Sequence, residues 1–250
     1  MLIKETNSYQ ETFNFVKKNL TKIFLISCFF SFLVVISDYY VIPVIQKIYF
    51  SVLSKDIGMH SLINTFNSMN FSQQKAFLQF SFLKNVVNTV SITFIIESIL
   101  MIAHFKILKK KIGLKKLYKL FFSIFPNLFL LIFFINIIIQ VGLIIFVIPA
   151  IAFLIFFSMS PIILVIEKKG VFYSIKKSFL VCLSRYKELT PPIFIWLFIK
   201  FILLMCSSIL KILPENLFIF SYNIISNFIL CVLIVHLFKL YSLFANIKKF

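Results

Sequence analysis

Six apolar stretches of about twenty residues dominate this chain, and they constrain its fold more than any other feature. A helix needs about 20 apolar residues to cross the hydrocarbon core of a bilayer. The stretches lie at 23–43, 85–105, 121–140, 143–166, 191–212 and 217–238. With 61% hydrophobic residues and a mean hydropathy of +1.02, the chain is more apolar than soluble domains, in which about half of the residues are apolar. We predict an all-α integral membrane protein whose six transmembrane helices form a bundle, as one polytopic domain over 1–250.

The stretches differ in how clearly they are bounded. Asn88 and Glu97 dilute the second stretch, whereas the third and fourth run almost together, with Gln140 and Gly142 marking the only tight turn between them. The outer loop, 44–84, has no apolar core of its own, and Ser72 reads as the start of a capped helix. We expect one or two short interfacial helices in this loop rather than a soluble domain.

The basic residues orient the predicted helices. With the N-terminus inside, twenty Lys and Arg residues fall in the inner segments and five in the outer ones, the asymmetry typical of cytoplasmic loops. Both termini are therefore expected in the cytoplasm. The net charge of +18 lies in clusters between apolar stretches, so we expect no nucleic-acid partner.

Each outward-going helix follows a basic amphipathic stretch, at 9–22, 106–120 or 171–188. In the third stretch the apolar positions recur at three- and four-residue steps: Phe172, Ile175, Phe179, Cys182 and Tyr186. The opposite face carries Lys176, Lys177, Ser184 and Lys187. Such a helix can lie in the headgroup plane with its Lys residues on anionic lipid. An ordinary helical cytoplasmic loop is the alternative.

Signatures of catalysis and of cofactor or metal binding are missing from the sequence. Four glycines in the whole chain form no phosphate-binding loop, and there is no GxSxG or HExxH motif. The four cysteines are scattered, and each isolated His is expected to be solvated or interfacial. We therefore expect no enzyme activity, no catalytic or metal-binding residues and no cofactor.

Six polar residues inside the predicted helices are candidates for function: Glu97, Lys200, Asn136, Gln140, Asn223 and Asn227. Asn136 with Gln140, and Asn223 with Asn227, each share a helix face at a spacing of four. They could line a polar pathway, or they could form interhelical hydrogen bonds that fix the packing. Glu97 and Lys200 lie at matching depths, so a further hypothesis pairs them, because an unpaired charge in the bilayer is costly.

Three prolines fall in the third and fourth stretches: Pro126, Pro149 and Pro161. Proline removes a backbone donor and tends to kink or break a helix. We expect Pro149 and Pro161 to interrupt the fourth helix.

Several short segments, in order and spacing, resemble the YciC family of bacterial inner-membrane proteins over nearly the whole chain. They include Pro126–Phe129, Gln140–Gly142, Ser160–Pro161, Glu167–Ser178, Trp196–Lys200, Ser226–Asn227 and Leu237–Tyr241. The resemblance implies a six-helix protein of the bacterial inner membrane without an assigned reaction.

From these observations we expect a membrane protein that acts by association with lipid, particularly anionic headgroups, or with other envelope proteins. The alternative is a small transporter or channel that uses the intramembrane polar residues. A continuous polar cavity lined by Asn136, Gln140 and Lys200 would favour transport, whereas a tightly packed bundle would favour association.

Overall fold

The computed structural model describes residues 2–53, 69–107, 114–207 and 215–245, and this part of the chain consists of helices joined by short turns, without strands. Its helices are α1 (Leu2–Lys18), α2 (Leu20–Leu53), α4 (Phe71–Ile107), α5 (Leu114–Ile145), α6 (Val147–Phe157), α7 (Ser160–Glu167), α8 (Val171–Ser207) and α9 (Glu215–Phe244). The segments long and apolar enough to cross a membrane are 20–40, 71–105, 118–145, 147–167, 171–206 and 217–244. The predicted all-α class with six such helices is thus confirmed.

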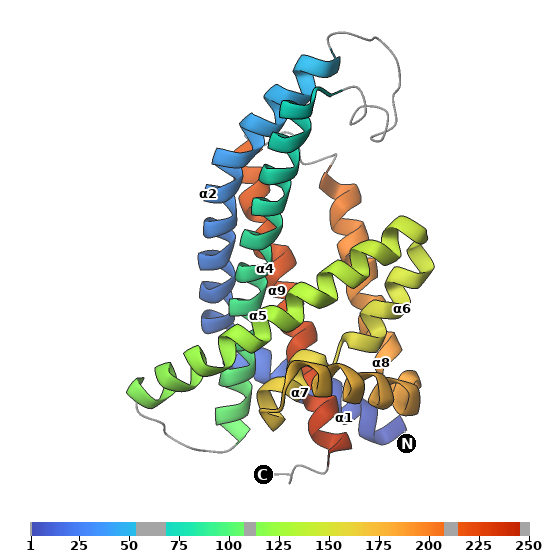
Figure 1. Cartoon of the computed structure of the whole chain (residues 1–250). Helices are drawn as coiled ribbons and strands as arrows, with labels where there is room; N and C mark the ends of the chain where they lie inside the picture. The colour runs from blue at the N-terminus through green and yellow to red at the C-terminus, as the bar shows by residue number, and fades with distance from the viewer. Residues whose placement is uncertain (1, 54–68, 108–113, 208–214, 246–250) are drawn as a thin grey trace.

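Three long helices, α2, α4 and α9, lie side by side and contact one another in every pair. Helix α5 crosses this group obliquely, turns into α6, and α6 packs against α8 (Figure 1). Helix α1 packs on α9, and α7 lies against α8. Both α1 and the C-terminal end of α9 lie at the same end of the molecule, which we call the inner end.

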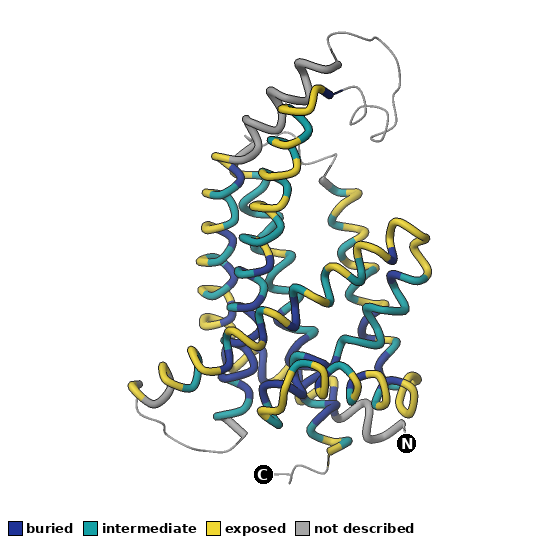
Figure 2. Tube along the Cα trace, in the orientation of Figure 1, coloured by how far each residue is buried: buried dark blue, intermediate teal, exposed yellow. Residues whose placement is uncertain are grey.

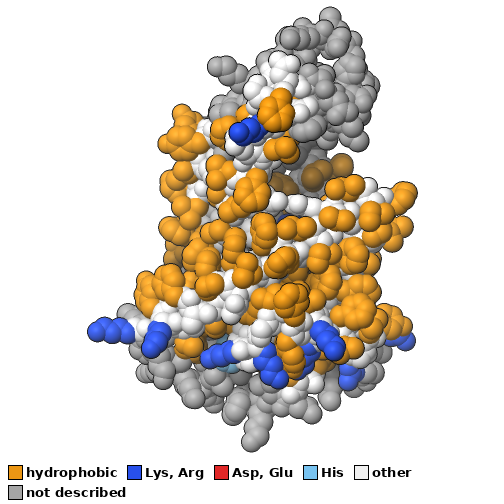
Figure 3. All heavy atoms as spheres, viewed as in Figure 1, with side chains coloured by type: hydrophobic (Ala, Val, Ile, Leu, Met, Phe, Trp, Pro, Cys, Tyr) orange, Lys and Arg blue, Asp and Glu red, His pale blue; other side chains and the backbone are white. Residues whose placement is uncertain are grey.

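Burial is concentrated toward the inner end, where dark blue segments gather in Figure 2. The core there combines side chains of α4, α7 and α9, including Leu100, Ile163 and Phe238. The outward faces of the helices carry exposed apolar side chains in a broad belt (Figure 3). Such a belt suits contact with lipid, because a soluble protein rarely exposes apolar patches of this extent.

The outer part of the molecule differs from the expected short interfacial helices. Helix α2 continues to Leu53, and α4 already begins at Phe71, fourteen residues before the expected span. The side chain of Gln73 accepts a hydrogen bond from the backbone N–H of Asn70 at 3.0 Å, as in a capping box. The helix start expected at Ser72 is thus adjacent to the real one, but the helix runs on without a break into the span. Residues 54–68 lie outside the described part.

The turn between α5 and α6 is not at Gln140–Gly142, where we expected it, but at Phe146. Helix α5 continues to Ile145, and Phe146 adopts an extended conformation (φ −165°, ψ 159°). Gly142 instead allows the two helices to approach. A Cβ placed on it would lie 3.0 Å from the Cα of Ala150 and 3.1 Å from the Cδ2 of Phe153. Gly142 therefore allows close contact between two helices and does not reverse the chain.

The fourth predicted span is divided, as the prolines suggested. Helix α6 ends at Phe157 and α7 begins at Ser160, with Pro161 in its first turn. Pro149 lies in the first turn of α6, where a missing N–H breaks no helical hydrogen bond. The Ser178 hydroxyl donates to the carbonyl oxygen of Phe156 at 2.7 Å, so α8 satisfies an acceptor at the break.

The third amphipathic stretch and the fifth span form one helical run, α8, with a kink at Arg185 (φ −131°, ψ 27°). Pro191 and Pro192 follow the kink inside the helix. The Thr190 hydroxyl donates to the carbonyl oxygen of Tyr186 at 2.6 Å. The segment before the kink can therefore take its own direction at the inner end. The last part of the expected span, 208–212, lies outside the described residues.

Candidate functional site

Exposed basic side chains gather at the inner end of the molecule, below the apolar belt (Figure 3). They come from α1, α2, α5, α8 and the α7–α8 junction: Lys17, Lys18, Lys22, Lys115, Lys119, Lys168, Lys169, Lys176, Arg185 and Lys187. We call this set the basic layer. Elements distant in the sequence thus build one positively charged rim next to an apolar surface.

The first part of α8, residues 171–184, is an amphipathic helix within this layer. Its side chains at four-residue steps, Ser174, Ser178 and Cys182, are buried against the protein. Phe172 is 84% exposed and points away from the protein, whereas Phe179 is 40% exposed and its ring lies 5.0 Å from that of Phe156 on α6. We expected Cys182 on the same face as Phe172, but it packs inward, against the protein. The small side chains of this inner face let α8 lie close to its neighbours.

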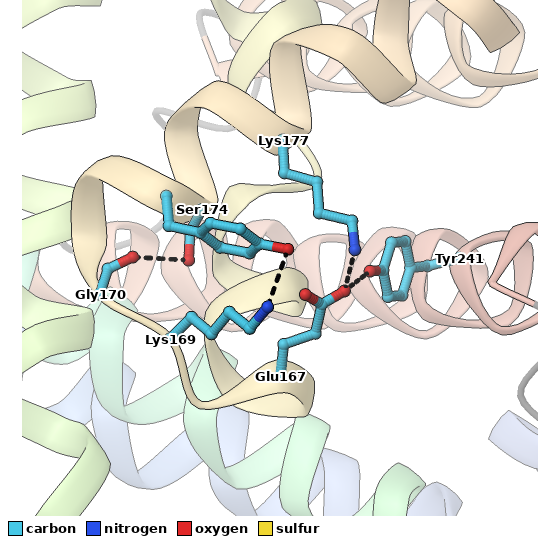
Figure 4. A network of polar contacts seen from close by, with 7 residues as sticks. Glu167, Lys169, Gly170, Ser174, Lys177 and Tyr241 are labelled. Carbon is cyan, nitrogen blue, oxygen red and sulfur yellow. Dashed lines mark hydrogen bonds and ion pairs between the residues drawn. The ribbon is translucent and has the colours of Figure 1, made fainter.

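A hydrogen-bonded network holds this helix in place (Figure 4). Glu167, the last residue of α7, accepts hydrogen bonds from the Lys177 ammonium and the Tyr241 hydroxyl. One carboxylate thereby joins α7, α8 and α9. Lys177 is thus turned toward Glu167, whereas the sequence placed it on the solvent face. The segments 167–178 and 237–241, which carried part of the family resemblance, meet at this network.

The chain between α7 and α8 is shaped for a sharp change of direction. Lys168 adopts a left-handed conformation (φ 53°), which ends α7. The Lys169 ammonium donates to the Tyr173 hydroxyl at 3.3 Å and lies 4.3 Å from the centre of its ring. The Ser174 hydroxyl donates to the carbonyl oxygen of Gly170 at 3.1 Å. Lys168, Lys169 and Lys176 therefore project around a firmly attached helix start.

Helix α1 is attached to α9 by polar contacts at the same end. The Thr12 hydroxyl lies 3.2 Å from Nδ1 of His236, whose ring stacks on Tyr9 at 4.4 Å between centroids. The Lys239 ammonium donates to the Glu11 carboxylate at 3.2 Å. His236 is 4% exposed, so the expectation that it would be solvated or interfacial was wrong. It is a buried partner of α1.

Two of the six candidate polar residues, Asn136 and Gln140, face α4. The Asn136 amide donates to the Thr89 hydroxyl at 3.2 Å, and the Asn85 amide donates to the Gln140 side-chain oxygen at 3.4 Å. The expected common face of Asn136 and Gln140 is thus used for hydrogen bonds between α4 and α5. On α4, Asn85 and Thr89 begin a polar row that continues at four-residue steps to Glu97.

The other asparagine pair lies on the side of α9 that faces α2. The Asn227 amide donates to the Ser31 hydroxyl at 3.0 Å. Asn223, one turn further out, lines a pocket between α2, α4 and α9 that also contains Asp38 and Lys84. The Asp38 carboxylate and the Lys84 ammonium form an ion pair at 3.1 Å.

Glu97 and Lys200 do not form the hypothesised pair. Glu97 is fully buried, and within the described part of the chain neither of its carboxylate oxygens has a hydrogen-bond partner. The Lys200 ammonium lies over the Trp196 ring on its own helix, 4.5 Å from the centroid. Asn136, Gln140 and Lys200 are likewise not joined by any contact among the described residues, because the amides face α4 while Lys200 stays beside Trp196.

Sequence reasoning missed Asp38 and Glu167. Asp38 lies inside the first expected span, and its charge there was the available signal. The charge of Glu167 was not a comparable signal, because it follows directly after an expected span, where charged residues are common. Within the described part of the chain, no three His, Cys, Asp or Glu residues are grouped so that they could hold a metal ion.

Comparison with known proteins gives consistent matches along the chain. The model of an uncharacterised protein family, UPF0259, matches residues 1–243. A UPF0259 membrane protein of Buchnera aphidicola subsp. Acyrthosiphon pisum (strain Tuc7) is 31% identical over 236 residues, 94% of this chain and 96% of the relative. A UPF0259 membrane protein of Yersinia pestis (strain Pestoides F) is 26% identical over 252 residues, 99% and 98% of the two chains. No solved structure matches the chain.

Proposed function

This chain belongs to the uncharacterised protein family UPF0259, whose relatives are named membrane proteins, and from that premise we propose that it binds anionic lipid headgroups along the cytoplasmic face of a bacterial inner membrane. On this proposal, the YciC family that the sequence resembles and UPF0259 are the same family. The protein acts by association and not by catalysis.

The orientation follows from charge. Twenty basic residues on one side against five on the other favour a cytoplasmic inner end. The common position of α1 and the C-terminal end of α9 supports the same assignment for both termini. The cytoplasmic leaflet carries anionic lipids that attract basic segments close to the membrane.

The observation that carries the proposal is the anchored helix at 171–184. The outward ring of Phe172 and the exposed part of the Phe179 ring can enter the boundary between headgroups and acyl chains. Lys168, Lys169 and Lys176 are exposed beside them, within reach of lipid phosphates. The Glu167 network keeps this segment in one position, so the charges are arranged before lipid binds.

Native mass spectrometry of the purified protein, titrated with phosphatidylglycerol or phosphatidylcholine, tests the proposal. The substitutions Lys168→Gln, Lys169→Gln and Lys176→Gln are made together. Each Lys near an anionic surface contributes about 1 kcal/mol, so the triple variant should bind phosphatidylglycerol at least tenfold more weakly. Binding of phosphatidylcholine should change little.

The matched control is Lys75→Gln, which removes an exposed charge from the outer part of α4. It should leave phosphatidylglycerol binding unchanged. Equal losses in the control and the triple variant, or no preference for the anionic lipid in the original protein, would contradict the proposal.

Transport is the second candidate, and Glu97 is the observation that favours it. A buried carboxyl group inside a span, with no hydrogen-bond partner among the residues described, is a candidate for carrying protons or cations. Against it, Asn136, Gln140 and Asn227 are engaged in hydrogen bonds between helices. Proteoliposomes containing a pH-sensitive dye separate the two: transport predicts a proton or cation flux that Glu97→Gln abolishes, whereas lipid association predicts no flux from either protein.

A further inference from the structure

A pocket of about 330 Å³ lies between α2, α4 and α9, in the part of the molecule away from the basic layer. Its polar lining comes from all three helices: Ser37, Asp38, Lys84, Asn88, Tyr222 and Asn223. Val34, Phe218 and Ile219 form its apolar wall. Both signs of charge and two amides therefore surround one small space.

The pocket lies near the outer boundary of the hydrocarbon core. At 1.5 Å per residue, Asp38 is about 27 Å from the inner start of α2 at Leu20, and Asn223 is about 32 Å from the inner end of α9 at Phe244. The hydrocarbon core is about 30 Å thick. Tyr39 and Tyr40 beside Asp38 are 65% and 69% exposed, and tyrosines favour the membrane–water interface. Asp38 thus lies close to the outer end of its apolar span, 20–40, whereas Asn223 lies six residues inside the span 217–244.

Asp38 has capacity for a ligand. It is 7% exposed, and its Oδ1 lies 3.1 Å from the Lys84 ammonium. A carboxylate offers about four acceptor positions, so a second ammonium can be received. The Lys84 side chain is 45% exposed and is long enough to turn toward another anion without leaving the pocket.

We propose that this pocket binds the headgroup of an outer-leaflet phospholipid that carries a primary ammonium and a phosphodiester, as phosphatidylethanolamine does. The ligand ammonium donates to Asp38, while Lys84 turns to the phosphate. The amides of Asn88 and Asn223 donate to the remaining phosphate oxygens, and the apolar wall receives the glycerol end. This site goes beyond the proposed cytoplasmic lipid contacts and recognises a different headgroup.

The chemistry discriminates against the other common headgroups. Phosphatidylcholine has a quaternary ammonium without N–H groups, so it cannot donate to Asp38. Phosphatidylglycerol has no cation, so Asp38 would repel its phosphate. The contact between Asp38 and the ammonium therefore gives the selectivity for this lipid, whereas the contacts with the phosphate contribute affinity for any phospholipid.

Competition native mass spectrometry of the full chain with the three lipids tests this inference. The original protein should prefer phosphatidylethanolamine over phosphatidylcholine at least tenfold. Asp38→Asn should abolish that preference, and Lys84→Gln should weaken binding of both lipids to this site. Asn223→Leu, which keeps the ion pair but removes a donor to the phosphate, should likewise weaken binding of both lipids.

The control Lys239→Gln breaks the ion pair with Glu11 at the opposite end and should retain the preference, as should the triple lysine variant of the basic layer. That variant separates failure of this inference from failure of the proposed function. Equal binding of the three lipids, a preference that survives Asp38→Asn, or undiminished binding of both lipids by Asn223→Leu would overturn the inference. Glycerophosphoethanolamine competing as strongly as the lipid would overturn the assignment to a membrane lipid and indicate a soluble ligand.

Discussion

Glu97 lies in a packed interior, where no residue that the structure describes forms a hydrogen bond with its carboxyl group. Charged groups inside a membrane protein usually pair with one another, which is why depth alone suggested Lys200 as a partner. Depth gives the level of a side chain but not the direction in which it points around its helix. Lys200 instead lies over the Trp196 ring one turn earlier on α8, a contact that sequence spacing of four residues allows.

We predict that Glu97 and Lys200 contribute independently to the stability of the protein. Glu97→Leu removes a buried polar group without a partner and should raise stability, since leaving such a group unsatisfied costs about 1–3 kcal/mol. Lys200→Met should lower stability by about 0.5–2 kcal/mol through loss of the cation–π contact.

Thermal unfolding in detergent of both single variants and the double variant gives the coupling energy. Additive effects, within about 0.5 kcal/mol, are expected. A double variant that recovers the loss caused by either single substitution would show that the two residues do pair.

The helices extend well beyond the apolar stretches from which they were predicted. An apolar stretch measures the thickness of the lipid core, whereas a helix ends where its backbone loses hydrogen-bond partners. Helix α4 therefore starts at Phe71 and α5 ends at Ile145, although the stretches predicted 85 and 140. Pro149 and Pro161 were expected to interrupt one helix; they lie instead in the first turns of α6 and α7, because proline fits the first turn of a helix. Gly142 was predicted to mark a turn. Its actual role, close packing against Ala150, depends on the tertiary fold and could not be predicted from the sequence.

Substitution of the two glycines separates close packing from turn formation. Gly142→Ala places a Cβ 3.0 Å from the Cα of Ala150 and should force α5 and α6 apart, at a cost of about 1–3 kcal/mol. Gly170→Ala meets no atom within 4 Å and should be tolerated.

The comparison is made by thermal unfolding in detergent, with size-exclusion chromatography to verify folding. Equal stability of the two variants would show that α5 and α6 do not approach at Gly142.

The whole molecule combines a packed inner half with a more loosely packed outer part. Composition and charge were sufficient to predict the class, the number of spans and the side on which lysines gather. They could not show that α2, α4 and α9 form one group, or that Glu167, Lys177 and Tyr241 meet, since neighbouring helices in lipid are selected by side-chain packing and hydrogen bonds rather than by hydrophobicity. Asp38, Lys84 and Asn223 come together for the same reason, from three helices far apart in sequence.

Orientation in the membrane underlies both lipid sites, and cysteine accessibility in intact cells measures it directly. On a background in which the four native cysteines are replaced, Asn70→Cys marks the outer start of α4, and Lys176→Cys marks the basic layer; both positions are exposed. A maleimide that cannot cross the inner membrane should label Asn70→Cys in intact cells and Lys176→Cys only after the inner membrane is permeabilised. Labelling of Lys176→Cys in intact cells, with Asn70→Cys protected, would reverse the orientation and contradict the account.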